Sequence, residues 1–416
     1  MRRLMLLAVV ILLAVVALGC PMNVTHYRDS DGSLVYVGNY SNDGSLALVD
    51  AQVKATAYDV SGNVMAQASD PMCEILPGSG VLPFEVTFPS NIADPARVDI
   101  KVVGTPTAEP FLATGLEANV VAETKSTELG ETWVTGVVTN KSAEKYYTGH
   151  ICVAWTDTNG NVVRVAFDDT GLIDFPPGAS LPFVVAADLP PEALNINFYL
   201  DAGRVPPGDV ARPVVSLPDS AFKNMFSVGY LFTSPSLSHE GAPILGYGEI
   251  TNTTSHPISA PSISATFSDA SGNLLAAGEP MTLCPADIVP PGEFTFGGFQ
   301  IVTPAGASGL PKLQIQAEDF SGFESYYLKA TNVQVTGSAS GAEITGTVKN
   351  ASTKNLSILT VCGGVFDAHG EFLGADWVRM TPAGGLAPGA SADFTIDLPS
   401  ALGDPSTAQA FGTGRP

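Results

Sequence analysis

A strand-and-turn signature occurs four times in the chain and constrains the fold more than any other feature of the sequence. Each copy ends in an aspartate followed three residues later by a glycine, and the glycines are Gly62, Gly160, Gly272 and Gly370. Their spacings of 98, 112 and 98 residues recur for an upstream asparagine, at Asn42, Asn140, Asn252 and Asn350. Two landmarks in one register indicate a tandem repeat of four modules.

The copies are related as two pairs. Copies 1 and 3 are offset by 210 residues, as are copies 2 and 4, so that Gly136 aligns with Gly346 and Cys152 with Cys362. We infer that a two-module unit was duplicated. The 14 extra residues between copies 2 and 3 fall in a proline-rich stretch, and prolines at this density predict a semi-rigid linker over residues 204–223.

The pattern inside each copy predicts β-strands. Val53, Ala55 and Ala57 alternate with polar residues before the first Asp–Gly turn, which is typical of a half-buried strand joined by a tight turn to the next. A Pro-Gly pair and then a phenylalanine follow in every copy: Pro77-Gly78 with Phe84, Pro177-Gly178 with Phe183, Pro291-Gly292 with Phe296, and Pro388-Gly389 with Phe394. Only 14% of residues are charged, which also favours short strands and many turns over solvent-exposed helices.

We therefore expect an all-β chain of four tandem immunoglobulin-like β-sandwich domains after an N-terminal apolar signal segment. The expected domains span residues 21–105, 116–203, 224–318 and 328–413. The order of elements resembles the FxLYD family of bacterial Ig-like modules, and Ala57-Tyr58-Asp59 and Val365-Phe366-Asp367 come closest to its naming motif. That resemblance implies a sandwich fold in an exported protein or lipoprotein, and it implies no catalytic residues, because the family has none established.

Residues 1–20 read as an export signal. Arg2 and Arg3 precede an unbroken apolar run that ends at Gly19, and Cys20 follows. The run is shorter than the ~20 residues that span a bilayer as a helix. The segment Ala17-Leu18-Gly19-Cys20 resembles a lipobox, with its first two positions swapped, which implies lipidation of Cys20, for example with palmitate. A cleaved signal peptide and an uncleaved anchor remain alternatives, and all three predict export to the cell surface or the periplasmic side of a membrane.

The other four cysteines fall one to a module. A disulfide within one sandwich is therefore impossible, and we hypothesise cross-domain disulfides Cys73–Cys152 and Cys284–Cys362, since exported proteins meet an oxidising environment. The alternative is four reduced, locally buried thiols. Cys152 aligns with Lys54, on the strand face opposite the apolar one, so we expect the cysteines to lie off the main cores.

No motif predicts catalysis, a cofactor or a metal site. Asp157-Thr158-Asn159-Gly160-Asn161 and Asp29-Ser30-Asp31-Gly32 space oxygen ligands as calcium loops do, but neither reaches a bidentate glutamate, and the first recurs as a hairpin turn. A net charge of −22 argues against nucleic acid as a partner. Among the aromatic residues, we expect Trp155 in a core and Trp377 exposed, and the pairs Tyr146-Tyr147 and Tyr326-Tyr327 to point one ring outward each.

These observations predict a non-enzymatic, envelope- or surface-anchored protein whose modules serve as a spacer, adhesion element or protein-docking array. It would be held at the membrane by its N-terminal lipid or signal anchor. The alternative is a glycan- or small-ligand-binding accessory lipoprotein, which needs an aromatic platform or a cleft at a module junction. The third and weakest hypothesis is a hydrolase whose active site is assembled from loops.

Overall fold

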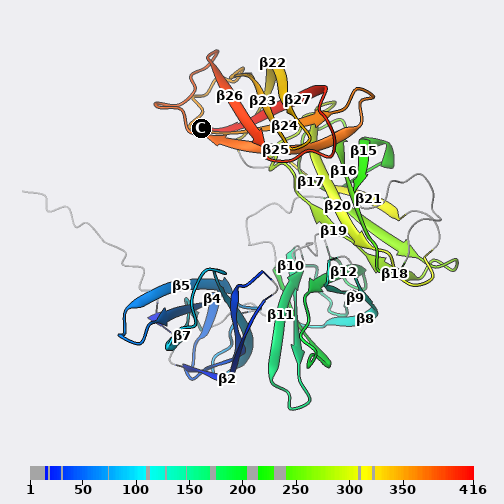
Figure 1. Cartoon of the computed structure of the whole chain (residues 1–416). Coiled ribbons are helices and arrows are strands. Elements are labelled where there is room, and N and C mark those ends of the chain that lie inside the picture. The colour runs from blue at the N-terminus through cyan, green and yellow to red at the C-terminus, as the bar shows by residue number, and fades with distance from the viewer. Residues whose placement is uncertain are drawn as a thin grey trace, which may run out of the picture.

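The computed structural model describes residues 15–16, 19–29, 31–73, 75–108, 113–126, 129–146, 148–168, 175–203, 214–228, 240–307, 311–320 and 324–416. The predicted all-β class is confirmed: these residues form antiparallel sheets and contain no α-helix, only a short 3-10 turn at Asp219–Ala221 (Figure 1). No helix among them is long and apolar enough to cross a membrane. The predicted signal segment lies mostly outside the described residues.

The described strands form seven sheets, which group along the chain into four successive units that we call modules 1 to 4. In module 1 one sheet has the order β1-β7-β4-β5 and the other β2-β3-β6. Its strands are β1 (Val15–Val16), β2 (Gly19–Arg28), β3 (Leu34–Asn42), β4 (Ala47–Tyr58), β5 (Val64–Pro71), β6 (Val81–Phe88) and β7 (Arg97–Thr107). The alternating residues Val53, Ala55 and Ala57 of β4 meet Phe84 and Val86 of β6 in one core, as the period-two pattern predicts.

Module 2 repeats this arrangement, with sheets β11-β10-β13 and β12-β9-β8. Its strands are β8 (Leu116–Lys125), β9 (Thr132–Asn140), β10 (Thr148–Thr156), β11 (Val162–Asp168), β12 (Ser180–Ala187) and β13 (Asn195–Gly203). Trp155 is 2% exposed and packs with Val153 and Phe183, so its expected place in a core is confirmed.

Module 3 has the sheets β14-β21-β17-β18 and β15-β16-β20-β19. Its strands are β14 (Val214–Leu217), β15 (Phe222–Val228), β16 (Pro243–Thr251), β17 (Ile258–Ser268), β18 (Leu274–Ala277), β19 (Glu279–Met281), β20 (Phe294–Val302) and β21 (Lys312–Asp319). The expected linker at residues 204–223 is therefore wrong for its second half, because β14 pairs with β21 and Phe222–Lys223 pair with β16. Pro218 directly follows β14, where its missing N–H breaks no ladder. Residues 204–213 lie outside the described part.

Module 4 joins its two layers through one long strand. Residues Tyr326–Lys329 of β22 pair with β27, and Ala330–Ser338 pair with β23, which gives the order β25-β24-β27-β22-β23-β26. The strands are β22 (Tyr326–Ser338), β23 (Gly341–Lys349), β24 (Ile358–Phe366), β25 (Phe372–Met380), β26 (Ser391–Leu398) and β27 (Thr407–Arg415). Leu328, Ile344, Val361 and Ile396 fill the space between the layers.

The repeated asparagine and the repeated Pro-Gly turn are two halves of one hydrogen-bonded unit. In module 2, the Asn140 Nδ2 donates to the carbonyl oxygens of Glu144 (2.8 Å) and Phe175 (3.0 Å), and its Oδ1 accepts from the Ser142 N–H (2.9 Å). The other three asparagines make the same set of bonds, and all four are at most 2% exposed. One side chain thus fastens the end of a strand to the chain before the Pro-Gly turn, which explains why the two landmarks share a register.

The repeated aspartates serve the hairpin turns. Asp157 Oδ1 accepts the backbone N–H groups of Asn159 (2.8 Å) and Asn161 (2.9 Å), and Gly160 has a positive φ of 81°. Side-chain and backbone hydrogen bonds from Asn161 lower the pKa of this exposed carboxyl. The first three copies use Asp and Asn in this way, and in the fourth Asp367 receives the N–H groups of His369 and Glu371. The calcium-like spacing therefore reflects turn geometry.

Candidate binding surfaces at the module junctions

Two disulfides join neighbouring modules. Cys73 after β5 is bonded to Cys152 on β10, with Cα atoms 5.2 Å apart, and Cys284 after β19 is bonded to Cys362 on β24, with Cα atoms 5.9 Å apart. These are the two hypothesised pairs. All four residues are at most 4% exposed. Each bond closes a loop between two modules and restricts how one can move against the next.

Cys73 and Cys152 lie off the main cores, as we expected, in a second, smaller core, whereas the expectation is wrong for Cys284 and Cys362, which belong to the same large cluster as the core of module 3. Cys152 and Ala154 of β10 pack against Val35 and Val37, which point outward from β3 of module 1. Val162 and Val165 of β11 complete this junction cluster. The face of β10 opposite the core of module 2 is therefore buried against module 1. In module 1, the residue that aligns with Cys152 is the exposed Lys54.

The junction between modules 3 and 4 is built from aromatic rings. Phe296 on β20 stacks on Phe372 of β25 with ring centroids 5.3 Å apart, and Gly364 provides room, since a Cβ there would lie 2.6 Å from Phe296 Cζ. Tyr327 stacks on Phe411 at 5.2 Å and donates its hydroxyl to the Phe294 carbonyl (3.2 Å).

The Pro-Gly–Phe landmark is shifted in this third copy. Phe299 stands opposite Gly246 on the side that faces the module core, whereas Phe296 stands opposite Glu249 on the side that faces module 4. The ring that the repeat places in the core elsewhere therefore belongs here to the junction.

Modules 2 and 3 also touch. Trp133 and Val184, on the outer face of the β12-β9-β8 sheet, pack against Ala277 of β18 and Val302 of β20. The Ala277 N–H donates to Thr135 Oγ1 (3.2 Å). Trp133 is only 2% exposed, so the joint between the two module pairs includes a packed contact as well as the proline-rich segment.

The corresponding face of module 4 is polar. Glu343 occupies the position that aligns with Trp133, and Thr345 the position that aligns with Thr135. Glu343 lies opposite the exposed Asp397, and Thr345 opposite the exposed Thr395. This face is therefore apolar in module 2, where module 3 covers it, and polar in module 4.

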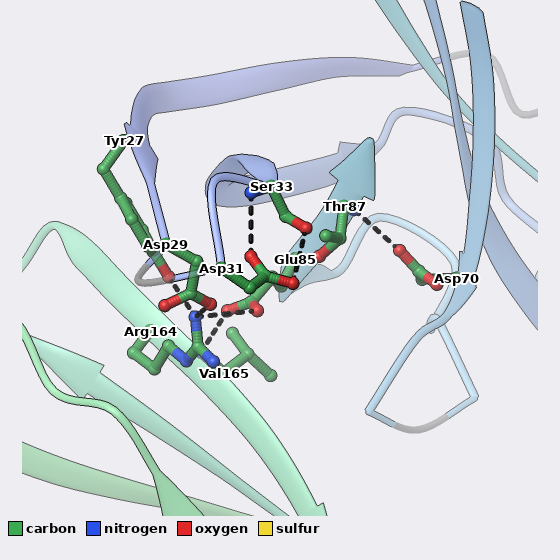
Figure 2. A network of polar contacts seen from close by, with 9 residues as sticks. All are labelled: Tyr27, Asp29, Asp31, Ser33, Asp70, Glu85, Thr87, Arg164 and Val165. Carbon is green, nitrogen blue, oxygen red and sulfur yellow. Dashed lines mark hydrogen bonds and ion pairs between the residues drawn. The ribbon is translucent and has the colours of Figure 1, made fainter. Parts of the chain in front are cut away.

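A buried ionic network closes the junction of modules 1 and 2 (Figure 2). The Arg164 guanidinium on β11 donates to the Tyr27 hydroxyl (2.6 Å) and to Asp29 (2.9 Å), and its Nη1 lies 3.4 Å from Glu85 Oε1. Glu85 Oε2 accepts the Val165 N–H (2.9 Å). The side chains of Arg164 and Glu85 are 15% and 13% exposed. One cation from module 2 thus holds three groups of module 1.

Burial raises the pKa of Glu85 from 4.5 to about 7, although the Arg164 charge and the Val165 hydrogen bond act in the opposite direction. A carboxyl with such a pKa is suited to proton transfer in an open cleft. Here its two oxygens are engaged by Arg164 and Val165, so the network serves as a fastening between modules.

A cleft lies beside each disulfide. The first has a volume of about 540 Å³, and its lining includes Asp50, Cys73, His150, Phe167 and Asp201. The second is about 210 Å³ and is lined by Pro285, Asp287, Ile358, Thr360, Trp377, Arg379, Thr413 and Arg415. The two are equivalent in the duplication, because Phe167 pairs with Cys152 across β11 and β10, and Trp377 pairs with Cys362 across β25 and β24.

The remaining predicted site residues are scattered. Cys20 is exposed in β2, opposite Ser41 of β3. Trp377 is 44% exposed, as expected. In the tyrosine pairs, Tyr146 is buried and bonded through its hydroxyl to the Thr114 backbone, while Tyr147 lies outside the described residues. The described part holds no cluster of three or more His, Cys, Asp or Glu residues that could bind a metal ion.

Sequence reasoning missed the Arg164 network. Its members come from four separate strands or turns, and Arg164 has no counterpart in the repeat that marks it. Its sequence signal is weak: a lone arginine beside the valines of a strand in a chain with few basic residues. No family model and no curated protein sequence matches this chain.

Proposed function

We propose that the protein is a non-enzymatic, exported lipoprotein whose four immunoglobulin-like, FxLYD-type sandwiches form a stiff array in the cell envelope, for docking or adhesion. The observation that carries the proposal is the pair of buried cross-module disulfides. Structural disulfides form and persist outside the reducing cytosol. Apolar and ionic contacts reinforce both junctions, and such fastening suits an element that must hold a fixed reach.

The position of Cys20 supports an anchor there. Cys20 is exposed and lies at the start of β2, so cleavage before it removes β1, which contributes only two residue pairs to β7. The remainder of β2 stays paired with β3. A lipid on Cys20 would therefore hold module 1 near the membrane, while the strongly negative net charge of the chain repels anionic headgroups from the folded part.

Labelling with palmitate tests the anchor. We expect the full chain to incorporate labelled palmitate and to fractionate with membranes, whereas Cys20→Ala should take up no label. Labelling of the Cys20→Ala variant, or recovery of the wild-type chain from the cytosol with reduced thiols, would refute the proposal.

A further inference from the structure

We propose that the cleft beside Cys284–Cys362, at the junction of modules 3 and 4, binds an acidic sugar residue of a polysaccharide, with Trp377 stacked on the sugar ring and Arg379 paired with its carboxylate. This inference deepens the proposed function, since it names the class of partner that the array would dock. The cleft is about 210 Å³, smaller than the roughly 300–1,000 Å³ of typical drug-sized sites, and so is suited to a single ring.

The binding groups share one face of a sheet. Trp377 and Arg379 are two residues apart on β25 and so point to the same side. Thr360 of β24 lies directly opposite Arg379, and Thr413 of β27 lies opposite Thr360. A row of one guanidinium and two threonines therefore runs beside the indole, and the Thr413 hydroxyl has no hydrogen-bond partner in the described part of the chain.

Trp377 stands out among the tryptophans. Trp133 and Trp155 are each 2% exposed, whereas Trp377 is 44% exposed on a regular strand next to a disulfide. A partly exposed aromatic ring at the edge of a cleft offers an apolar surface that a ligand can cover. The flat face of an indole packs against the apolar C–H face of a sugar while polar neighbours bond its hydroxyl groups.

The charge of the cleft is opposite to that of the protein. Two of the 19 basic residues, Arg379 and Arg415, line this small space. Arg415 is neutralised by Asp287, with its Nε 2.8 Å from Asp287 Oδ2. Arg379 is exposed and makes no ion pair within the described residues, so its planar fork is open to a carboxylate.

The equivalent cleft of the first module pair provides a contrast inside the same molecule. Phe167 aligns there with Trp377, and Asp169 aligns in the sequence with Arg379. His150 and Asp201 also line that cleft, where Thr360 and Thr413 line the second. We therefore assign acidic-sugar recognition to the C-terminal cleft alone.

Titration of the full chain with trigalacturonate, and with maltotriose as a neutral control, tests the proposal. Because Trp377 is the exposed tryptophan, its fluorescence should change as trigalacturonate binds, and calorimetry should give the affinity. Arg379→Gln should weaken binding at least about 10-fold, and Trp377→Ala should abolish the fluorescence change and weaken binding by a similar factor. Arg97→Gln, at an exposed arginine paired with Asp99 in module 1, should leave binding unchanged.

Equal binding of maltotriose, no binding of trigalacturonate at millimolar concentration, or wild-type affinity in the Arg379→Gln variant would overturn the assignment. The outcomes are separable from the proposed function. A chain that is lipidated and exported but binds no acidic sugar refutes this inference alone, whereas a chain that is neither exported nor lipidated refutes the proposed function whatever it binds.

Discussion

The buried asparagine of each module offers the sharpest test of how the repeat folds. In Asn140→Ala the carbonyl groups of Glu144 and Phe175 lose a donor, and the N–H and hydroxyl of Ser142 lose their acceptor. At about 1 kcal/mol for each net hydrogen bond, the module should lose about 4 kcal/mol. Asn140→Asp keeps the shape but turns a carboxylate toward two carbonyl oxygens, so its cost should be larger still.

Urea unfolding followed by tryptophan fluorescence measures this loss, since Trp155 is buried in the core of the same module. Asn159→Ala is the matched control, because Asn159 is exposed in the hairpin turn of module 2 and should change stability by less than about 0.5 kcal/mol. If Asn140→Asp unfolds at the same urea concentration as Asn159→Ala, the asparagine does not fasten the strand to the Pro-Gly turn and the reasoning is wrong.

Three further predictions concern the junctions. The pKa of Glu85 in the folded protein, about 7, lies above its ordinary value of 4.5, so the contribution of Glu85 to stability is fully present below pH 4.5 and is lost as the pH rises through 7. The free energy of unfolding, measured with urea, should therefore fall by at most about 3 kcal/mol over this range. Glu85→Gln should flatten this dependence on pH, and an unchanged dependence would contradict the assignment. Replacing Cys73 and Cys152 together by serine should cost about 4 kcal/mol in non-reducing unfolding, given a sequence separation of 79 residues, and no loss would argue that the bond is absent. Gly364→Ala should lower the free energy of unfolding by about 1–3 kcal/mol through the clash with Phe296, which a lower melting temperature would show, and an unchanged melting temperature would mean that the rings do not stack there.

The repeat predicted much of the fold because its landmarks are local devices. The Asp–Gly turns, the Pro-Gly turns and the alternation of Val53, Ala55 and Ala57 all act over a few residues and appear in the structure where the sequence pattern places them. The linker at 204–223 was partly wrong because proline density cannot distinguish a spacer from a short strand that has prolines before and after it in the sequence. These residues form strands because they pair with β21 and β16, which come later in the sequence.

The candidate sites were harder to predict because they lie between modules. Alignment of Cys152 with Lys54 placed the cysteine off the core but did not show that a neighbour covers that face. The meeting of Arg164 with Tyr27 depends on how two modules dock, and no local pattern encodes it. The side of the sheet on which Phe296 lies was equally hard to predict, because a shift in strand register turns its ring from the core of module 3 to the junction with module 4.

We propose that two disulfide-fastened module pairs stand in the cell envelope on an anchor at Cys20. Peptide mapping by mass spectrometry, on the full chain purified from native membranes without reductant and alkylated before digestion, tests it most directly. We predict two cystine-linked peptide pairs, Cys73 with Cys152 and Cys284 with Cys362, and a lipid-bearing N-terminal peptide that starts at Cys20. Alkylation of all five cysteines, with Cys20 in an uncleaved peptide that spans Gly19 and carries no lipid, would contradict it.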